Sequence, residues 1–263
     1  MQIGAMNHPN EPLAREIAWM AELKLDFIDL TLEPPAAATW QLRPAEVTAM
    51  LRDHDLGVIG HTAYYLPIAS SFESLRQAAV DELKRAAEFF AKVGAKWMNL
   101  HPDGHAPFVD DRAIVVRNIS SLREIVEFAQ PLGIGVMLEN VPGRFNTALQ
   151  LGPIFEAVPQ LGLHLDIGHS NLAVEHNTAG ELIAQFGRRL AHVHVHDNRG
   201  GQADLHLALG MGQIDVAKHV RQLRASGYDE TITLEVFSRD RHFLGYSRDR
   251  LLEFWEKAGN EEN

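Results

Sequence analysis

Histidines and carboxylates stand at the ends of short apolar segments along this chain. Six of them close six consecutive segments of strand length: His61, His101, Glu139, Asp166, His194 and Glu235. The sequence contains no cysteine, so any metal ion would be held by nitrogen and oxygen ligands. Three carboxylates and one imidazole within the six suit Mn²⁺, Mg²⁺, Co²⁺ or Zn²⁺, and they are Glu139, Asp166, His194 and Glu235.

A single histidine or aspartate at the end of a strand is more often a helix cap or a partner in a loop hydrogen bond than a metal ligand. Six such residues on consecutive strands are poorly explained in this way. Carboxylates buried side by side without a cation repel one another and are driven toward protonation. We therefore predict a site for one to three divalent metal ions, with coordination positions left for substrate oxygens.

Further candidate ligands follow the sixth and seventh segments. His169 comes three residues after Asp166, and it is either another ligand or a hydrogen-bond donor to the substrate. Strand alternation puts His194 and His196 on the same face, and we predict that His194 reaches the centre while His196 lies at the rim. Asp204 and His206 lie on a glycine-flanked loop and could complete a second cluster with His169. As an isolated pair, such residues are more often ordinary polar residues of a loop.

These residues need a scaffold that brings the ends of separate strands together. Short apolar segments alternate with longer stretches of helical periodicity from one end of the chain to the other. Nearly continuous apolar segments are typical of a parallel sheet that is covered on both faces. We expect strands at Ile3–Met6, Phe27–Thr31, Val58–His61, Trp97–His101, Val136–Glu139, Leu163–Asp166, Ala191–His194 and Ile232–Glu235.

Eight strand-helix units in 263 residues match the size of one (β/α)8 barrel, about 250 residues. The predicted fold class is α/β, a single (β/α)8 TIM barrel over residues 1–259 with a frayed polar tail at 260–263. A doubly wound open sheet is the alternative, but no glycine-rich dinucleotide loop follows the first segment. In a TIM barrel the strand ends meet at the mouth, where active sites are built.

The overall charge argues against a general nucleic-acid surface. The chain has 24 Lys+Arg against 35 Asp+Glu and a net charge of −11, which repels polyanions but leaves room for a local basic groove. No segment approaches about 18 uninterrupted apolar residues, and no leader-like pattern precedes the first segment. We expect a cytoplasmic enzyme with no membrane partner.

Aromatic residues in the predicted loops have two interpretations. They could wall a substrate pocket, or they could form the contacts of a homo-oligomer. They are Trp40, Tyr64, Tyr65, Phe108 and Phe237.

Five stretches of the sequence resemble a known group of barrels. They are Asn99-Leu100-His101-Pro102, Leu138-Glu139-Asn140, Leu165-Asp166-Ile167-Gly168-His169, His194-Val195-His196-Asp197 and the segment from Asp204 to Asp215. Over essentially its whole length the chain resembles the xylose-isomerase-like barrel superfamily. That group includes sugar isomerases and epimerases, inosose-processing enzymes and endonuclease IV of AP endonuclease family 2.

The resemblance implies ligands for two kinds of enzyme. In the sugar isomerases and epimerases, two glutamates that flank the sugar carbon also bind the catalytic metal, within a set that matches Glu139, Asp166, His194 and Glu235. In endonuclease IV a three-zinc cluster for phosphodiester hydrolysis also uses positions that match His61, His101, His169, Asp204 and His206. All nine positions carry fitting residue types here, so the resemblance fixes the scaffold better than the reaction.

Two departures from endonuclease IV favour a small substrate. The first strand lacks the histidine-serine-glycine opening, and the second loop reads Glu33-Pro34-Pro35-Ala36-Ala37-Ala38 instead of a basic DNA-penetrating loop. Tyr64 matches a DNA-contacting aromatic position, but an aromatic residue there can equally pack on a small substrate.

The leading expectation is a metal-dependent sugar or sugar-phosphate isomerase or epimerase that transfers a proton at the carbon next to a carbonyl. Glu139 and Glu235 would be both ligands and bases, and His169 would stabilise the oxygen that gains charge. The alternative is a zinc phosphodiesterase that acts on abasic DNA. A metal-free binding barrel would leave too many carboxylates uncompensated.

Four residues are candidates for substrate contact. Tyr64 and Asn140 would touch the sugar directly. An anionic substituent would be met by Arg199 or Arg144, although loop arginines are more often solvated.

Overall fold

The eight apolar segments form the strands of a closed sheet. The computed structural model describes residues 1–104 and 109–260. The strands pair in parallel in chain order, and β8 pairs with β1, so the predicted TIM barrel is confirmed and the open sheet is excluded. They are β1 (Gln2–Met6), β2 (Phe27–Leu32), β3 (Gly57–Thr62), β4 (Trp97–Leu100), β5 (Gly135–Glu139), β6 (Gly162–Asp166), β7 (Leu190–Val195) and β8 (Thr231–Leu234).

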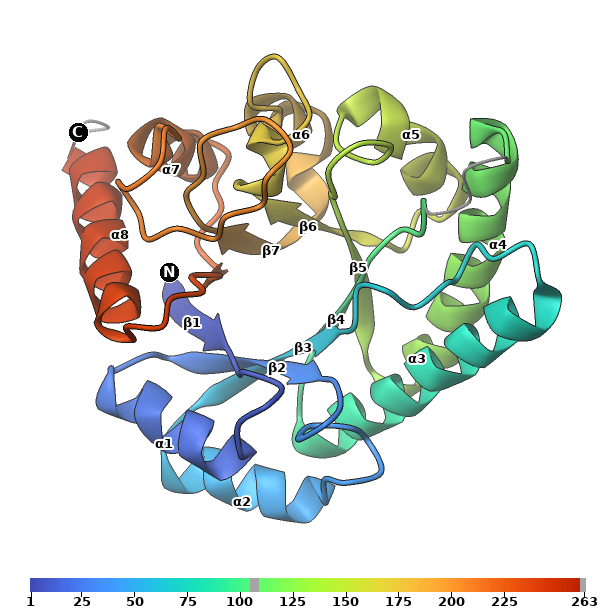
Figure 1. Ribbon diagram of the computed structural model, residues 1–263, viewed down its shortest axis with the longest axis horizontal. Helices are drawn as coiled ribbons and strands as arrows, with labels where there is room; N and C mark the ends of the chain where they lie inside the picture. The colour runs from blue at the N-terminus through green and yellow to red at the C-terminus, as the bar shows by residue number, and fades with distance from the viewer. Residues whose placement is uncertain (105–108, 261–263) are drawn as a thin grey trace.

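A helix follows each strand, and the helices form a ring around the sheet (Figure 1). The last helix reaches Asn260, and the rest of the predicted polar tail, 261–263, lies outside the described residues. No helix in the described ranges is long and apolar enough to cross a bilayer. The helices are α1 (Leu13–Glu22), α2 (Pro44–Asp53), α3 (Glu73–Val93), α4 (Asp111–Ala129), α5 (Ala148–Ala157), α6 (Ala179–Phe186), α7 (Val216–Ala225) and α8 (His242–Asn260), with short 3-10 turns at Gln130–Leu132, His169–Asn171 and Gly187–Arg189.

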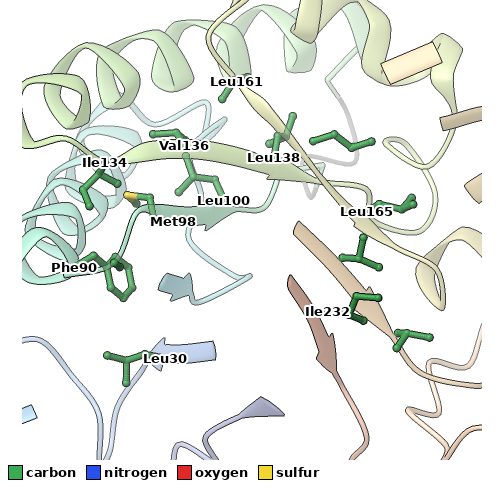
Figure 2. Packing of buried hydrophobic residues seen from close by; sticks show 14 of the residues in the cluster. Leu30, Phe90, Met98, Leu100, Ile134, Val136, Leu138, Leu161, Leu165 and Ile232 are labelled. Atoms are coloured by element: carbon green, nitrogen blue, oxygen red, sulfur yellow. The ribbon is translucent and has the colours of Figure 1, made fainter. Parts of the chain in front are cut away.

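Strand alternation divides the apolar residues into two cores. The larger core lies between the outer face of the barrel and the helices, and Figure 2 shows Val136 and Leu138 of β5 within it. The smaller core lies inside the barrel, where Phe27, Ile59 and Met137 pack together with Trp97 at their edge. Phe27 and Trp97 stand at the beginnings of their strands, whereas Ile59 and Met137 are in register with Asp29 and Asn99. The interior is therefore apolar at the bottom of the barrel and mixed just above it.

Higher in the barrel the inner face becomes polar. The inward positions that follow the apolar floor carry fully buried side chains that hydrogen-bond or ionise, among them Asp29, Asn99, His164, His192 and Thr233. TIM barrels are usually filled by bulky branched apolar residues at such positions. The polar interior continues upward into the predicted metal ligands at the strand ends.

The outer core gives a direct test of packing. Phe90 on α3 is fully buried, and a methyl group added at Gly60 of β3 would come within 2.8 Å of its ring. We expect Phe90→Ala to lower the free energy of unfolding by about 3–5 kcal/mol, because it removes a large buried ring and leaves a cavity. Phe72→Ala, which truncates a ring that is 72% exposed, is the matched control. Equal effects of both in denaturant titrations would contradict the described packing.

Candidate metal centre

A cavity of about 1140 Å³ opens at the end of the barrel where the strands finish. Its wall combines side chains that follow β3, β4, β5 and β8 with others from the loops after β6 and β7. Two of the predicted metal ligands, Asp166 and His194, are fully buried and do not line it, and the same is true of His196. The others that the cavity contacts are His61, Tyr64, His101, Glu139, His169, Asp204, His206 and Glu235.

The predicted ligands gather into overlapping groups whose candidate ligand atoms lie within 4.8 Å of one another. His169 and His196 each belong to two of these groups. The groups at the mouth are His61, His101 and Glu139; Glu139, Asp166 and His194; Asp166, His169, His196 and Glu235; and His169, His196, Asp204 and His206.

Glu139 is held from several sides at the end of β5. Its Oε2 lies 3.0 Å from His101 Nε2 and accepts a hydrogen bond of 2.9 Å from Asn99 Nδ2, while its Oε1 lies 3.0 Å from His169 Nδ1. Burial alone would raise the pKa of Glu139, but the nearby charges of His164 and His101 bring it well below its usual value. The side chain is therefore an ionised carboxylate in a fixed orientation.

Asp166 lies between two other carboxylates. Burial raises the pKa of Asp166, and the negative charges of Glu235 and Glu139 add to this, against the opposing effect of His169 and His196. Its Oδ1 accepts a hydrogen bond of 2.8 Å from the backbone N–H of His169. Its Oδ2 is buried without a hydrogen-bond partner, so a cation is the group that the surroundings of Asp166 lack.

The two histidines at the end of β7 face different partners. His194 Nε2 lies 2.6 Å from Asp29 Oδ2, and its Nδ1 lies 3.4 Å from Glu235 Oε2. His196 Nε2 has no hydrogen-bond partner and lies 3.5 Å from Asp166 Oδ1. The sequence predicts His194 at the centre and His196 at the rim. The structure holds His194 through Asp29 while its Nδ1 faces Glu235, and it also directs His196 toward Asp166, so both rings reach the carboxylates of the mouth.

The loop after β7 brings the second pair of candidates into the same site. Asp204 Oδ2 lies 3.1 Å from His169 Nε2 and 3.0 Å from His206 Nε2, so the cluster expected from the sequence is present. Burial would lower the pKa of His206, but the hydrogen bond to Asp204 and the charge of Glu235 raise it. The pKa of His169 is raised well above its usual value against the effect of burial, mainly by Asp166 and Asp204.

Asp197 is the residue that fixes this loop, a role that sequence reasoning missed. Its buried carboxylate accepts hydrogen bonds from the backbone N–H groups of Asn198, Gly210, Gly212 and Ile214 at 2.9–3.1 Å. Its backbone also exchanges two hydrogen bonds with Leu207. Asp197 therefore closes the loop that carries Asp204 and His206.

Asn140 and Arg199 are placed away from the cavity. Asn140 is fully buried, and it hydrogen-bonds to the backbone of Asp166, accepting from its N–H at 2.8 Å and donating to its C=O at 3.0 Å. It positions a candidate ligand and does not meet the cavity. Arg199 is exposed and does not line the cavity either. Arg144 lines it, but its guanidinium lies 3.1 Å from the carboxylate of Asp111.

The aromatic candidates divide between the cavity and the outer surface. Tyr64 lines the cavity and is 63% exposed, and Phe237 lines it with its ring stacked on His206 at 4.4 Å between centroids. Trp40 and Tyr65 are exposed and lie outside the lining. Phe108 lies outside the described residues.

Below the mouth lies a layer of histidines that the sequence did not single out. His164 and His192 occupy neighbouring inward positions on β6 and β7, and both are fully buried. Burial lowers the pKa of each, most strongly for His164, where the neighbouring His194 adds to the effect. The only sequence signal was a histidine at alternate positions of apolar strands.

The donor set passes a chemical test for metal binding. Buried polar atoms are normally hydrogen-bonded, yet several side-chain atoms of the residues in these groups have no such partner. Imidazole nitrogens and carboxylate oxygens are the ligands that Zn²⁺ and Mn²⁺ accept. These unpaired atoms are His61 Nδ1, His101 Nδ1, Asp166 Oδ2, His194 Nδ1, His196 Nε2 and Glu235 Oε2.

Comparison with known proteins gives one family and several relatives. A family model described as xylose isomerase-like TIM barrel matches residues 17–258. An uncharacterized protein of Methanocaldococcus jannaschii is 31% identical over 86% of this chain and 79% of its own. The probable endonuclease 4 of Mycobacterium ulcerans is 29% identical over 95% of this chain and 99% of its own.

Among solved structures, a D-tagatose 3-epimerase-like protein matches the whole of both chains. The TM-score is 0.88 and the sequence identity is 26%. The similarity therefore extends over the barrel and all the loops that form the cavity.

The loop glycine beside His196 gives the prediction for this site. A methyl group added at Gly168 would overlap the His196 ring, so the ring must leave its present position beside Asp166. We expect Gly168→Ala to weaken binding of Mn²⁺ or Zn²⁺ by about 10- to 100-fold, the usual effect of misplacing a ligand through its support. Gly152→Ala on α5 is the control, because a methyl group there meets nothing within 4 Å. Unchanged affinity in Gly168→Ala, measured by calorimetric titration, would show that His196 is not a ligand.

Proposed function

Because the chain belongs to the family of xylose isomerase-like TIM barrels, we propose that it is a divalent-metal-dependent sugar isomerase or epimerase. One observation carries the proposal. Glu139 and Glu235 both line the cavity, and each has a candidate ligand atom within 4.8 Å of one on Asp166. The whole-chain similarity to a D-tagatose 3-epimerase-like protein supports the same reaction class.

The residues that would hold the ion are Glu139, Asp166, His196 and Glu235. Both His194 Nδ1 and His196 Nε2 are unpaired, and we take His196 because its nitrogen lies nearer to Asp166, at 3.5 Å against 3.9 Å for His194. A bound divalent ion would supply positive charge to the substrate oxygens next to the carbon that loses its proton.

Glu139 and Glu235 are suited to move that proton. Burial would raise the pKa of Glu235, but hydrogen bonding to His194 and the charge of that ring hold it well below its usual value. The pKa of Glu139 is lowered in the same way by His164 and His101. Both carboxylates are therefore in the basic form at neutral pH. If one takes a proton from one side of the carbon and the other returns one from the opposite side, the centre is inverted.

Other residues would orient the substrate and limit its contact with water. Tyr64 and Phe237 line the cavity with apolar surface, which suits the faces of a sugar ring. His169 lines the same wall within hydrogen-bond distance of Glu139 and Asp204. As a protonated ring it can donate a hydrogen bond to an oxygen that gains negative charge. The cavity of about 1140 Å³ exceeds the usual 300–1,000 Å³ of small-molecule sites, so it has room for a sugar that carries a substituent.

The glutamates should be needed for chemistry beyond holding the ion. We expect Glu139→Gln and Glu235→Gln each to lower the rate of solvent-deuterium exchange into a bound ketose by about 10²- to 10⁴-fold, because glutamine keeps an oxygen ligand but is not a base. Exchange is measured by NMR at the carbon position that loses its proton. The protein is loaded with Mg²⁺ or Zn²⁺ and kept free of Mn²⁺. Glu88→Gln, an exposed change on α3, is the control.

The outcome separates the ligand role from the base role. Metal content must be measured on the same samples, since loss of the ion alone would also stop exchange. Both variants exchanging at the wild-type rate with full metal would place the base elsewhere.

A second function, a zinc phosphodiesterase, is favoured by one specific observation. His61, His101, His169, Asp204 and His206 are not required for a single ion held by four ligands, yet the structure brings them into two further groups beside it. Clustered divalent ions can stabilise both the attacking and the leaving oxygens of a phosphodiester. The similarity to the probable endonuclease 4 of Mycobacterium ulcerans agrees with this function.

Asp204→Asn distinguishes the two functions. Asp204 lies 32% exposed at the edge of the cavity and contacts none of the four ligands of the single-ion site except His196, at 3.6 Å. We expect its loss to reduce ketose exchange by less than about tenfold, or ~1.4 kcal/mol of activation free energy. If the wild type instead binds three zinc ions and cleaves abasic DNA, and the variant loses one ion together with cleavage, the phosphodiesterase is the correct function.

A further inference from the structure

We propose that the interior of the barrel contains a second, enclosed metal site, in which His164, His192 and His194 bind one zinc-class ion with Asp29 as the fourth ligand. This site lies below the mouth and does not rest on the proposed reaction. It would be a structural site that joins β2, β6 and β7 through the centre of the barrel.

The strands place three imidazoles where one ion can reach them all. His192 and His194 are two residues apart on β7, so both point inward. His164 on β6 is the direct neighbour of His192 across the sheet. Ligand atoms of the three rings lie within 4.8 Å of one another. A tetrahedral zinc ion with bonds of about 2.0–2.1 Å needs ligand atoms about 3.4 Å apart, a distance that small side-chain rotations provide.

Asp29 supplies the fourth corner from the opposite side of the barrel. Its Oδ2 lies 2.6 Å from His194 Nε2 and 3.6 Å from His192 Nε2. Three imidazoles with one carboxylate form a donor set of borderline softness. Such a set prefers Zn²⁺, Co²⁺, Ni²⁺ or Cu²⁺ to Mg²⁺ or Ca²⁺.

Unpaired buried atoms give independent support for this site. His164 Nε2 and Asp29 Oδ1 have no hydrogen-bond partner although both residues are fully buried, while His164 Nδ1 lies 3.2 Å from Glu139 Oε2. A polar atom in such a position is costly to leave without a partner. A metal ion would satisfy the free nitrogen of His164 and a free oxygen of Asp29 together.

Two of the residues set the interior site apart from the mouth. His192 belongs to the interior group alone among the groups that the described residues form, and Asp29 lies next to it. Since all four side chains are fully buried, the ion would be taken up as the chain folds. It would then resist chelators that remove ions from the open cavity.

The experiment uses this difference in access. The full chain, expressed with zinc in the medium, is treated with EDTA, desalted and analysed for metal by mass spectrometry before and after unfolding in guanidinium. We expect one zinc ion per chain to remain after EDTA and to be released on unfolding. His192→Ala and Asp29→Asn should lose the retained ion, whereas the mouth variant Asp204→Asn should keep it.

Two results would overturn the proposal. One is a folded, EDTA-treated wild type that retains no zinc, and the other is equal retention in wild type and His192→Ala. Should the variants fail to fold, anomalous diffraction at the zinc edge from wild-type crystals decides the matter without them. The proposal requires a peak about 2.0–2.1 Å from nitrogens of His164, His192 and His194. Peaks confined to the mouth would contradict it.

Discussion

The structure depends on one constraint, which is that inward side chains of a closed barrel have little access to water except at the mouth. Asp29, Glu139 and Asp166 all point into this enclosure and are 1% exposed or less. Each must be balanced by imidazoles or by a cation, because an isolated buried carboxylate is far too unfavourable. The histidines of β6 and β7 and the ligand groups at the mouth are both consequences of this requirement.

The positions of the candidate ligands at the mouth depend on a second set of buried polar residues. Asn140 pairs with the backbone of Asp166 and so fixes where β6 ends. Asp197 gathers four backbone N–H groups and thereby shapes the loop that carries Asp204 and His206. Neither residue needs to touch substrate. Hydrogen bonds of this kind hold ligands in a usable geometry before any ion or substrate arrives.

The sequence predicted the barrel well because each strand is a nearly continuous apolar run. This pattern can be recognised without knowing the register in which the strands pair. It also predicted that the strand-end residues would meet, since all eight strands are parallel. The sequence alone did not decide which of His194 and His196 is the better candidate ligand at the mouth. Alternation shows that the two share a face but not how high each stands, and the shift in register between β6 and β7 at Leu163 and His164 cannot be seen in one sequence.

Other residues were missed for a related reason. Asp29, His164 and His192 interrupt apolar strands at positions where a barrel normally packs aliphatic side chains, and the pattern of their own strand says nothing about their partners. Asp29 pairs with His194 across 165 positions of sequence. Contacts between opposite sides of a barrel depend on the register of every strand between them, so only the folded structure brings such pairs together.

The number of ions that the mouth can hold follows from its own charges. Four carboxylates meet there, and a single divalent ion balances two of them. The raised pKa values of His169 and His206 mean that protons on these rings can balance the other two. Further ions would need the same ring nitrogens, and those nitrogens bind metal only after losing their protons. Protons and additional metal ions therefore compete for His169 and His206, and single-ion occupancy is favoured at lower pH while multiple occupancy is favoured as pH rises.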